Sequence, residues 1–174
     1  MKSLSLFKKP EDQCIQLIKR TQTQEQFKAV EIEKIYNKLK PVEAISLLGE
    51  WKYGLIDTNS IYSQLVKKVK LVGKKFSSLD KVEPVIVLNE QGERISSNFW
   101  GYAKIKNISH RGITTAALEY DRAPLFEYYR YVDENTILGI ADFNGQDDMD
   151  NTDKYVYFYM SRLSNAAPYF ESRL

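Results

Sequence analysis

The spacing of hydrophobic residues along the chain changes near residue 80. Before that point, three segments carry apolar side chains about every third or fourth residue, which is typical of amphipathic helices. The first begins at Pro10, the second spans 23–39 and stops before Pro41, and the third is capped by Ser60 and ends toward Gly73. We therefore expect two amino-terminal helices that form a cap, and a third helix that lies against the main body of the fold.

Beyond residue 80 apolar and polar residues alternate, and a period of two is typical of β-strands. The expected strands span 84–88, 94–108, 113–121, 125–132, 136–143 and 155–163. Short turn-rich separators favour an antiparallel meander, and a strand at Trp51 brings the total to about seven or eight, enough to close a barrel. We predict a mainly β fold: one antiparallel barrel in residues 41–174 with a helical cap in 1–40, as one folding unit.

Composition narrows the class of protein. The chain has 174 residues, 43% of them hydrophobic, and a net charge of only +2, so it lacks the basic excess of a dedicated nucleic-acid binder. Its single cysteine, Cys14, cannot form an intramolecular disulfide. The amino terminus does not resemble a signal peptide and no apolar stretch approaches the roughly 20 residues that cross a bilayer. We expect a soluble cytoplasmic protein, monomeric or homodimeric.

A set of ordered motifs indicates a family. Gly49-Glu50-Trp51 opens the first strand, and the later motifs are Lys75-Phe76, Tyr120-Asp121, Tyr129-Arg130 and the segment 157–162. Together they resemble the bacterial GXWXG-motif family of unknown function, over about residues 41–163. Tyr53 stands where that family has its second glycine, and Gly54 follows it.

The same pattern is similar to the calycins, the group of lipocalins and fatty-acid-binding proteins. In calycins a Gly-x-Trp motif on the first strand packs beneath a basic side chain from the last strand. This resemblance implies that Gly49, Trp51 and Arg162 close one end of the barrel, where an arginine over an indole gains roughly 0.5–2 kcal/mol of cation–π attraction. A structural role for Trp51 is favoured over a ligand contact.

The remaining question is what faces the barrel interior. Alternation places residues on shared strand faces without showing which face points inward. The three groups are Trp100, Tyr102, Lys104 and Lys106; Thr114, Ala116, Leu118 and Tyr120; and Tyr128, Arg130 and Val132. Tyrosine, with twelve copies, suits a pocket for an amphipathic molecule, although aromatic residues also simply favour strands. The candidate ligand contacts are Trp100, Tyr102, Tyr120, Asp121, Tyr128, Arg130 and Asp142.

Charged strand residues are the sharper candidates, because a charge inside a barrel is costly unless it is paired or meets a charged ligand. Arg130 could clamp a carboxylate or phosphate, with Asp121 or Asp142 orienting it; the alternative is an ordinary cross-strand ion pair. We expect non-catalytic binding of a small lipid- or fatty-acid-like ligand, with no cofactor. The alternatives are an isomerase-, cyclase- or hydrolase-type enzyme that uses Asp121 as a base, and an interaction module with a filled core.

Other polar features favour ordinary structural roles. The only histidine, His110, lies in a turn-like segment and is expected on the surface, so a histidine metal or haem site is disfavoured. The acidic segment 142–153 lacks the glycine and closing glutamate of a calcium loop. Lysines on and after the third helix are expected to form a soluble face, or at most a peripheral membrane contact through Lys67, Lys68 and Lys70 beside a barrel mouth.

Overall fold

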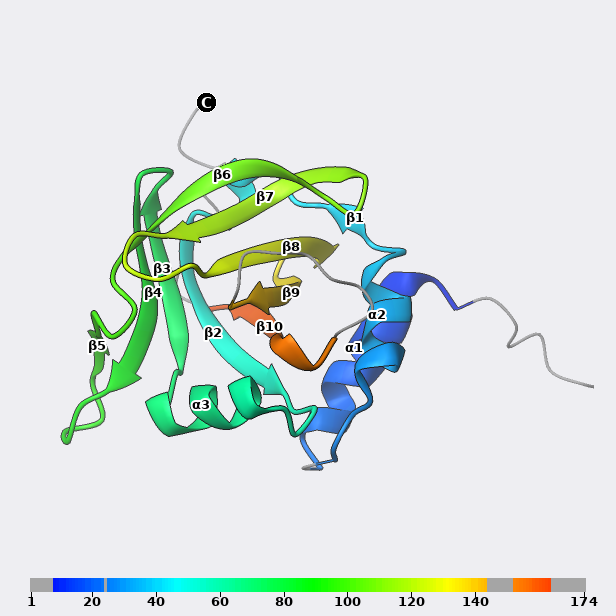
Figure 1. Ribbon diagram of the computed structural model, residues 1–174, viewed down its shortest axis with the longest axis horizontal. Coiled ribbons are helices and arrows are strands. Elements are labelled where there is room, and N and C mark those ends of the chain that lie inside the picture. The colour runs from blue at the N-terminus through cyan, green and yellow to red at the C-terminus, as the bar shows by residue number, and fades with distance from the viewer. Residues whose placement is uncertain (1–7, 24, 144–151, 164–174) are drawn as a thin grey trace, which may run out of the picture.

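A closed antiparallel barrel of eight strands forms the body of the protein (Figure 1), in a computed structural model that describes residues 8–23, 25–143 and 152–163. The strands are β1 (Lys40–Pro41), β2 (Gly49–Ile56), β3 (Gly73–Ser78), β4 (Lys81–Leu88), β5 (Arg94–Ser96), β6 (Ala103–His110), β7 (Ile113–Tyr120), β8 (Phe126–Asp133), β9 (Thr136–Asp142) and β10 (Tyr155–Arg162). The helices are α1 (Pro10–Thr21), α2 (Ala29–Tyr36) and α3 (Ile61–Val69), with short 3-10 turns η1 (Ala44–Leu47) and η2 (Thr152–Lys154).

The barrel follows the order β8-β7-β6-β4-β3-β2-β10-β9, and pairing of β9 with β8 closes it. β1 extends the wall beside β8, and β5 pairs with β4 outside the closed path. The seam between β4 and β6 is short, because its register holds one pair of Cα partners, Val82 and Ala103. The expected mainly β barrel with amino-terminal helices is thereby confirmed.

The helices differ from expectation at their ends. α2 begins at Ala29 rather than near residue 23, because the Phe27 amide donates to the carbonyl oxygen of Asp57 at 2.9 Å, which holds the preceding segment against the end of β2. The α3 cap is as expected, since Ser60 accepts from the amide of Ser63. α3 ends at Val69, with Lys70 after it in the left-handed conformation, whereas Gly73 starts β3.

The expected long strand 94–108 is two strands separated by a turn. The amide of Gly101 donates to the carbonyl oxygen of Asn98 at 2.9 Å, and Gly101 has a φ of +85°. A Cβ at Gly101 would lie 2.0 Å from Asp121 Oδ1, so the turn requires glycine at this position. β3 was not among the strands expected from alternation.

Hydrophobic residues pack on both sides of the barrel wall, in an interior layer and an outer layer. The interior layer lines the inside of the barrel and includes Trp51, Phe76, Leu118, Tyr129, Phe158 and Met160. The outer layer joins α1 and α2 to the outside of β8, β9 and β10, and it includes Cys14, Leu17, Ile32, Tyr36, Leu138 and Tyr157 (Figure 1). Strands in this part of the wall are therefore buried on both faces, which removes the alternation of polar and apolar residues.

One barrel end is closed by the Gly-x-Trp motif. The Arg162 guanidinium lies 4.1 Å from the Trp51 ring centroid and donates to the carbonyl oxygens of Leu48 and Ser46, each at 2.9 Å. The Trp51 indole donates to the carbonyl oxygen of Leu47 at 2.8 Å. Gly49 has a φ of +116°, and a Cβ there would meet Arg162 at 3.1 Å. This is the arrangement that the calycin resemblance implies.

α3 borders the other end, where β2 finishes and β10 begins (Figure 1). Its Val66 is buried with the interior layer, and Tyr62 packs against that layer from the same helix. No helix in the described residues is both long enough and apolar enough to cross a membrane.

Candidate functional site

A lysine and a glutamate form an ion pair inside the barrel. Lys74 of β3 is fully buried and Glu127 of β8 is 4% exposed, and Lys74 Nζ lies 2.8 Å from Glu127 Oε1. β3 and β8 are not neighbours in the sheet, so this contact crosses the barrel interior. Phe76 and Tyr129, two residues further along the same strands, also point into the interior layer.

A register shift between β3 and β4 lies beside Lys74 and provides one of its hydrogen-bond acceptors. Gly73 pairs with Ile86 whereas Lys75 pairs with Glu83, so β4 carries an extra residue around Pro84. Proline suits such a bulge because it lacks the amide that regular pairing would use. The Pro84 carbonyl oxygen accepts a hydrogen bond from Lys74 Nζ at 3.0 Å.

Tyrosine hydroxyls complete the cluster. Tyr120 donates to Glu127 Oε1 at 2.7 Å, and Tyr129 donates to Glu127 Oε2 at 2.6 Å. Lys74 Nζ also donates to the Tyr120 hydroxyl at 3.2 Å. The ammonium group therefore has three acceptors and the carboxylate three donors. We call Lys74, Tyr120, Glu127 and Tyr129 the interior cluster.

Burial sets the electrostatics of the cluster. Desolvation lowers the pKa of Lys74 from its ordinary value, and the charge of Glu127 partly opposes this effect. Burial, with the Glu127 charge second, raises the pKa values of Tyr120 and Tyr129 well above the usual range, and the same two causes raise that of Tyr53. These phenols therefore stay protonated as hydrogen-bond donors at neutral pH.

Aromatic rings surround the ammonium group. Lys74 Nζ lies 5.5 Å from the ring centroids of Tyr53 and Phe158, and 5.9 Å from that of Tyr120. The result is a charged, hydrogen-bonding centre within apolar and aromatic walls, which can bind a polar group or exchange a proton with it. Within the described ranges, no three His, Cys, Asp or Glu side chains gather closely enough to hold a metal ion.

Of the expected ligand contacts, Tyr120 lies in the interior cluster and Trp100 lies at the barrel end beside α3. The Trp100 ring is 5.6 Å from that of Phe143, which stacks on Tyr62 at 4.7 Å. Tyr102 is 47% exposed, and Asp121 is exposed and accepts from the Tyr102 amide at 2.9 Å. Asp121 thus holds a turn, and the interior carboxylate belongs to Glu127.

Tyr128, Arg130 and Asp142 lie on the outer face of the barrel wall, where all three are buried. Arg130 donates to the His110 carbonyl oxygen at 3.0 Å, and its guanidinium lies 4.7 Å from the Tyr36 ring centroid beneath the cap. Burial lowers the pKa of Arg130, and the nearby Arg111 acts in the same direction. The Asp142 carboxylate lies 4.0 Å from Lys154 Nζ. The acidic segment that follows Asp142 lies largely outside the described residues.

His110 is not on the surface, contrary to expectation. It is 2% exposed and stacks on Tyr128 with ring centroids 3.9 Å apart. The Tyr36 hydroxyl lies 3.1 Å from His110 Nδ1. Gly112 in the turn that follows is exposed, but α2 covers His110 at the end of β6, an effect that the sequence around the turn does not reveal.

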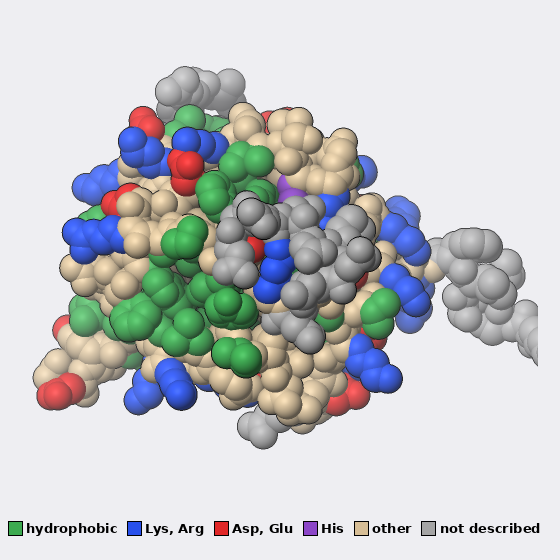
Figure 2. Space-filling model, in the orientation of Figure 1, with side chains coloured by type: hydrophobic (Ala, Val, Ile, Leu, Met, Phe, Trp, Pro, Cys, Tyr) green, Lys and Arg blue, Asp and Glu red, His purple; other side chains and the backbone are tan. Residues whose placement is uncertain are grey.

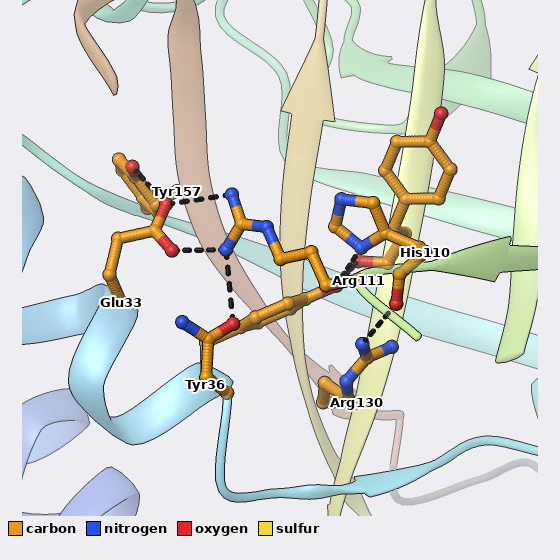
Figure 3. A network of polar contacts seen from close by, with 8 residues as sticks. Glu33, Tyr36, His110, Arg111, Arg130 and Tyr157 are labelled. Carbon is orange, nitrogen blue, oxygen red and sulfur yellow. Dashed lines mark hydrogen bonds and ion pairs between the residues drawn. The ribbon is translucent and has the colours of Figure 1, made fainter. Parts of the chain in front are cut away.

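A polar network fastens α2 to the barrel (Figure 3). Glu33 forms an ion pair with Arg111 and accepts a hydrogen bond from the Tyr157 hydroxyl at 2.6 Å. Arg111 also donates to Asn37 Oδ1 at 3.1 Å. Burial and the Glu33 hydrogen bond raise the pKa of Tyr157. This network lies outside the barrel, on the opposite side of the wall from the interior cluster.

Sequence reasoning missed Lys74 and Glu127. Lys74 is one of the lysines that follow α3, for which the sequence predicts a soluble face, but it is fully buried. The available signal was Glu127, a lone acidic residue two positions before Tyr129 in an aromatic strand. Because the outer face of β8 is also buried and also carries a charged residue, Arg130, alternation alone does not show that Glu127 faces inward.

Comparisons with known proteins find a match in each half of the chain. Residues 34–92 match the sequence profile described as GXWXG protein, and residues 101–162 match a domain of unknown function, DUF4334. A crystal structure of a protein from Thermomonospora curvata is similar, with 26% identity and a TM-score of 0.78 over 88% of this chain and 98% of that one. No curated protein matches. The resemblance to GXWXG proteins is confirmed, and the interior cluster draws Lys74 from the first matched region and its other members from the second.

Proposed function

We propose that this chain, a calycin-like barrel carrying the GXWXG and DUF4334 patterns, binds a small hydrophobic or amphipathic molecule with its polar group at the interior cluster. The observation that carries this proposal is the ion pair between Lys74 and Glu127 inside the barrel. Burying such a pair costs several kcal/mol per ion, and well-packed apolar residues of similar volume often serve stability as well or better. Recognition of a ligand's polar group supplies a reason for charges at this place.

The chemistry of the cluster favours an acceptor on the ligand. Lys74, Tyr120 and Tyr129 are donors, and they already converge on one carboxylate, that of Glu127. A carboxylate, hydroxyl or carbonyl oxygen of a ligand can share these donors through small rotations of the side chains. Lipid- and fatty-acid-like molecules carry such a group on an apolar body.

The aromatic residues at the α3 end suit that apolar body. Phe143 contacts both Tyr62 and Trp100, and all three pack against the interior layer. In this proposal the ligand enters at the α3 end, because Trp51 and Arg162 occupy the other. Tyr120 and Trp100 then contact the polar group and the apolar body, respectively.

Native mass spectrometry of protein purified from its host tests the proposal, followed by denaturing extraction of anything released. We expect a stoichiometric amphipathic molecule whose retention falls in the Lys74→Met variant. Lys104→Met is the matched control, since Lys104 is an exposed strand lysine, on β6. An unliganded mass that stays unchanged after addition of fatty acids would refute the binding proposal and favour an interaction module.

A second candidate is an enzyme of isomerase type that uses the same cluster. The observation in its favour is the lowered pKa of Lys74 beside the hydroxyl of Tyr120, which together with Glu127 forms a short proton-transfer chain. If a ligand is identified, incubation in heavy water distinguishes the candidates. An enzyme would exchange a carbon-bound proton of the ligand and lose this exchange in Glu127→Gln, whereas a carrier would return the ligand unlabelled.

A further inference from the structure

A partly exposed apolar strip lies at the α3 end of the barrel. It consists of Ile61, Tyr62, Phe143, Trp100 and Phe99, and ring contacts of 4.7, 5.6 and 5.2 Å connect its aromatic members in that order. Ile61 is 84% exposed and Phe99 is 59% exposed. Figure 2 shows hydrophobic side chains gathered on this face of the molecule, with basic side chains on the side where α3 lies.

The backbone holds the two most exposed members outward. Phe99 lies in the turn that the Gly101 amide closes onto Asn98, so it cannot fold back into the core without breaking that turn. Ile61 is the first residue of α3, immediately after the Ser60 cap. Large apolar side chains fixed in solvent by regular structure are typical of a contact surface.

Basic residues flank the strip. Lys68 lies two helical turns after Ile61, on the same side of α3, and Lys70 follows at the end of the helix. Lys67 forms an ion pair with Asp57, whereas within the described ranges neither Lys68 nor Lys70 lies within ion-pair distance of a carboxylate. Arg122 is exposed beside Gly101, on the other side of the strip.

We propose that this strip docks the barrel end on an anionic lipid surface, with Ile61, Trp100 and Phe99 entering the headgroup region and Lys68, Lys70 and Arg122 contacting the lipid headgroups. Aromatic side chains favour the boundary between headgroups and acyl chains, and basic residues around an apolar patch are attracted to anionic lipids. A second copy of this chain would instead bring the same basic residues together. This inference goes beyond ligand binding, since a docked barrel need not hold a ligand.

Co-sedimentation of ligand-stripped protein with vesicles tests the proposal. We expect binding to phosphatidylcholine vesicles that contain phosphatidylglycerol and much weaker binding to phosphatidylcholine alone. Phe99→Ser and Ile61→Ser should each weaken binding by up to about tenfold, because each removes most of one apolar side chain from the lipid boundary. Lys68→Gln and Lys70→Asn should each cost about fivefold, and asparagine tolerates the left-handed backbone at position 70.

Leu79→Ser is the matched control. Leu79 is 44% exposed in the β3–β4 turn, near the Gly49 end of β2 and away from the strip, so its replacement should leave vesicle binding unchanged. Brominated lipids should quench the fluorescence of Trp100 but not that of Trp51, which is fully buried at the far end of the barrel. The quenching should therefore disappear in Trp100→Phe.

Three outcomes would overturn the inference. One is absence of binding to anionic vesicles, and another is an equal loss in Leu79→Ser. The third is a dimer in analytical ultracentrifugation that Phe99→Ser dissociates, which would assign the strip to a second copy of the chain. Because ligand-stripped protein is used and lipid contact is measured directly, none of these outcomes depends on whether the barrel binds a ligand.

Discussion

The interior ion pair makes a specific prediction about stability. In Lys74→Met the methionine fills nearly the same volume, but the carboxylate of Glu127 stays buried and loses the ammonium group that lies 2.8 Å away in the native protein. Glu127 keeps the hydrogen bonds from Tyr120 and Tyr129. Removing one partner of a buried pair costs about 3–5 kcal/mol, so we expect a loss of free energy of unfolding near the lower bound, about 3 kcal/mol.

Urea denaturation at neutral pH measures this loss, with Glu127→Met and the double variant completing the cycle. Glu127→Met should cost a similar amount, because it leaves the ammonium of Lys74 buried with only neutral acceptors. The double variant should be less destabilised than the sum of the single variants by at least about 2 kcal/mol. Lys104→Met should change stability by less than about 0.5 kcal/mol, as an exposed substitution. Additive losses in the cycle would refute the assignment of a coupled buried pair.

Three further predictions concern the cap, the thiol and alkaline pH. Glu33→Gln should destabilise the protein by about 1–3 kcal/mol and speed hydrogen exchange in α2, since Arg111 loses its buried carboxylate. Unchanged exchange would show that the ion pair between Glu33 and Arg111 does not hold α2 to the barrel. Burial raises the pKa of Cys14 to about 12, so a thiol reagent at pH 8 should label it only after unfolding, and rapid labelling of native protein would contradict its burial. The tyrosines inside the barrel keep their protons in the folded state at pH values where unfolded tyrosine loses them. The free energy of unfolding should therefore fall as pH rises above about 10, by about 1.4 kcal/mol per pH unit for each of these tyrosines. In Tyr53→Phe, which removes one of these hydroxyls, the fall should be less steep.

The fold was predictable where one face of each strand meets solvent. In β6, Lys104 and Lys106 are exposed while Ala103 and Ile105 are buried, so alternation separates the two faces of this strand, although the predicted strand 94–108 is divided by the turn at Gly101. The helix beginning at Pro10 and the Ser60 cap are equally local signals. The Gly-x-Trp motif adds one long-range contact, because its family resemblance implies the arginine that covers the indole.

The site was not predictable by the same means, for two physical reasons. The cap buries the outside of β8, so Arg130 and Glu127 are both buried on opposite faces of one strand, and alternation cannot tell which faces the interior. Lys74 depends on the extra residue in β4 at Pro84, which aligns its amine with partners 46 and 53 positions later in the sequence. Such contacts depend on the strand register and on the closure of the barrel, which local sequence patterns do not encode.

The short seam between β4 and β6 determines how this barrel can come apart. The cap reinforces β8, β9 and β10 from outside, whereas β4 and β6 share one pair of Cα partners. We therefore expect that thermal fluctuations, which open the contacts with the fewest hydrogen bonds first, separate β4 from β6 and leave the capped part of the wall intact. The side-chain hydrogen bond between Lys74 of β3 and Glu127 of β8 joins strands on the two sides of that seam, so the interior cluster also holds the barrel closed.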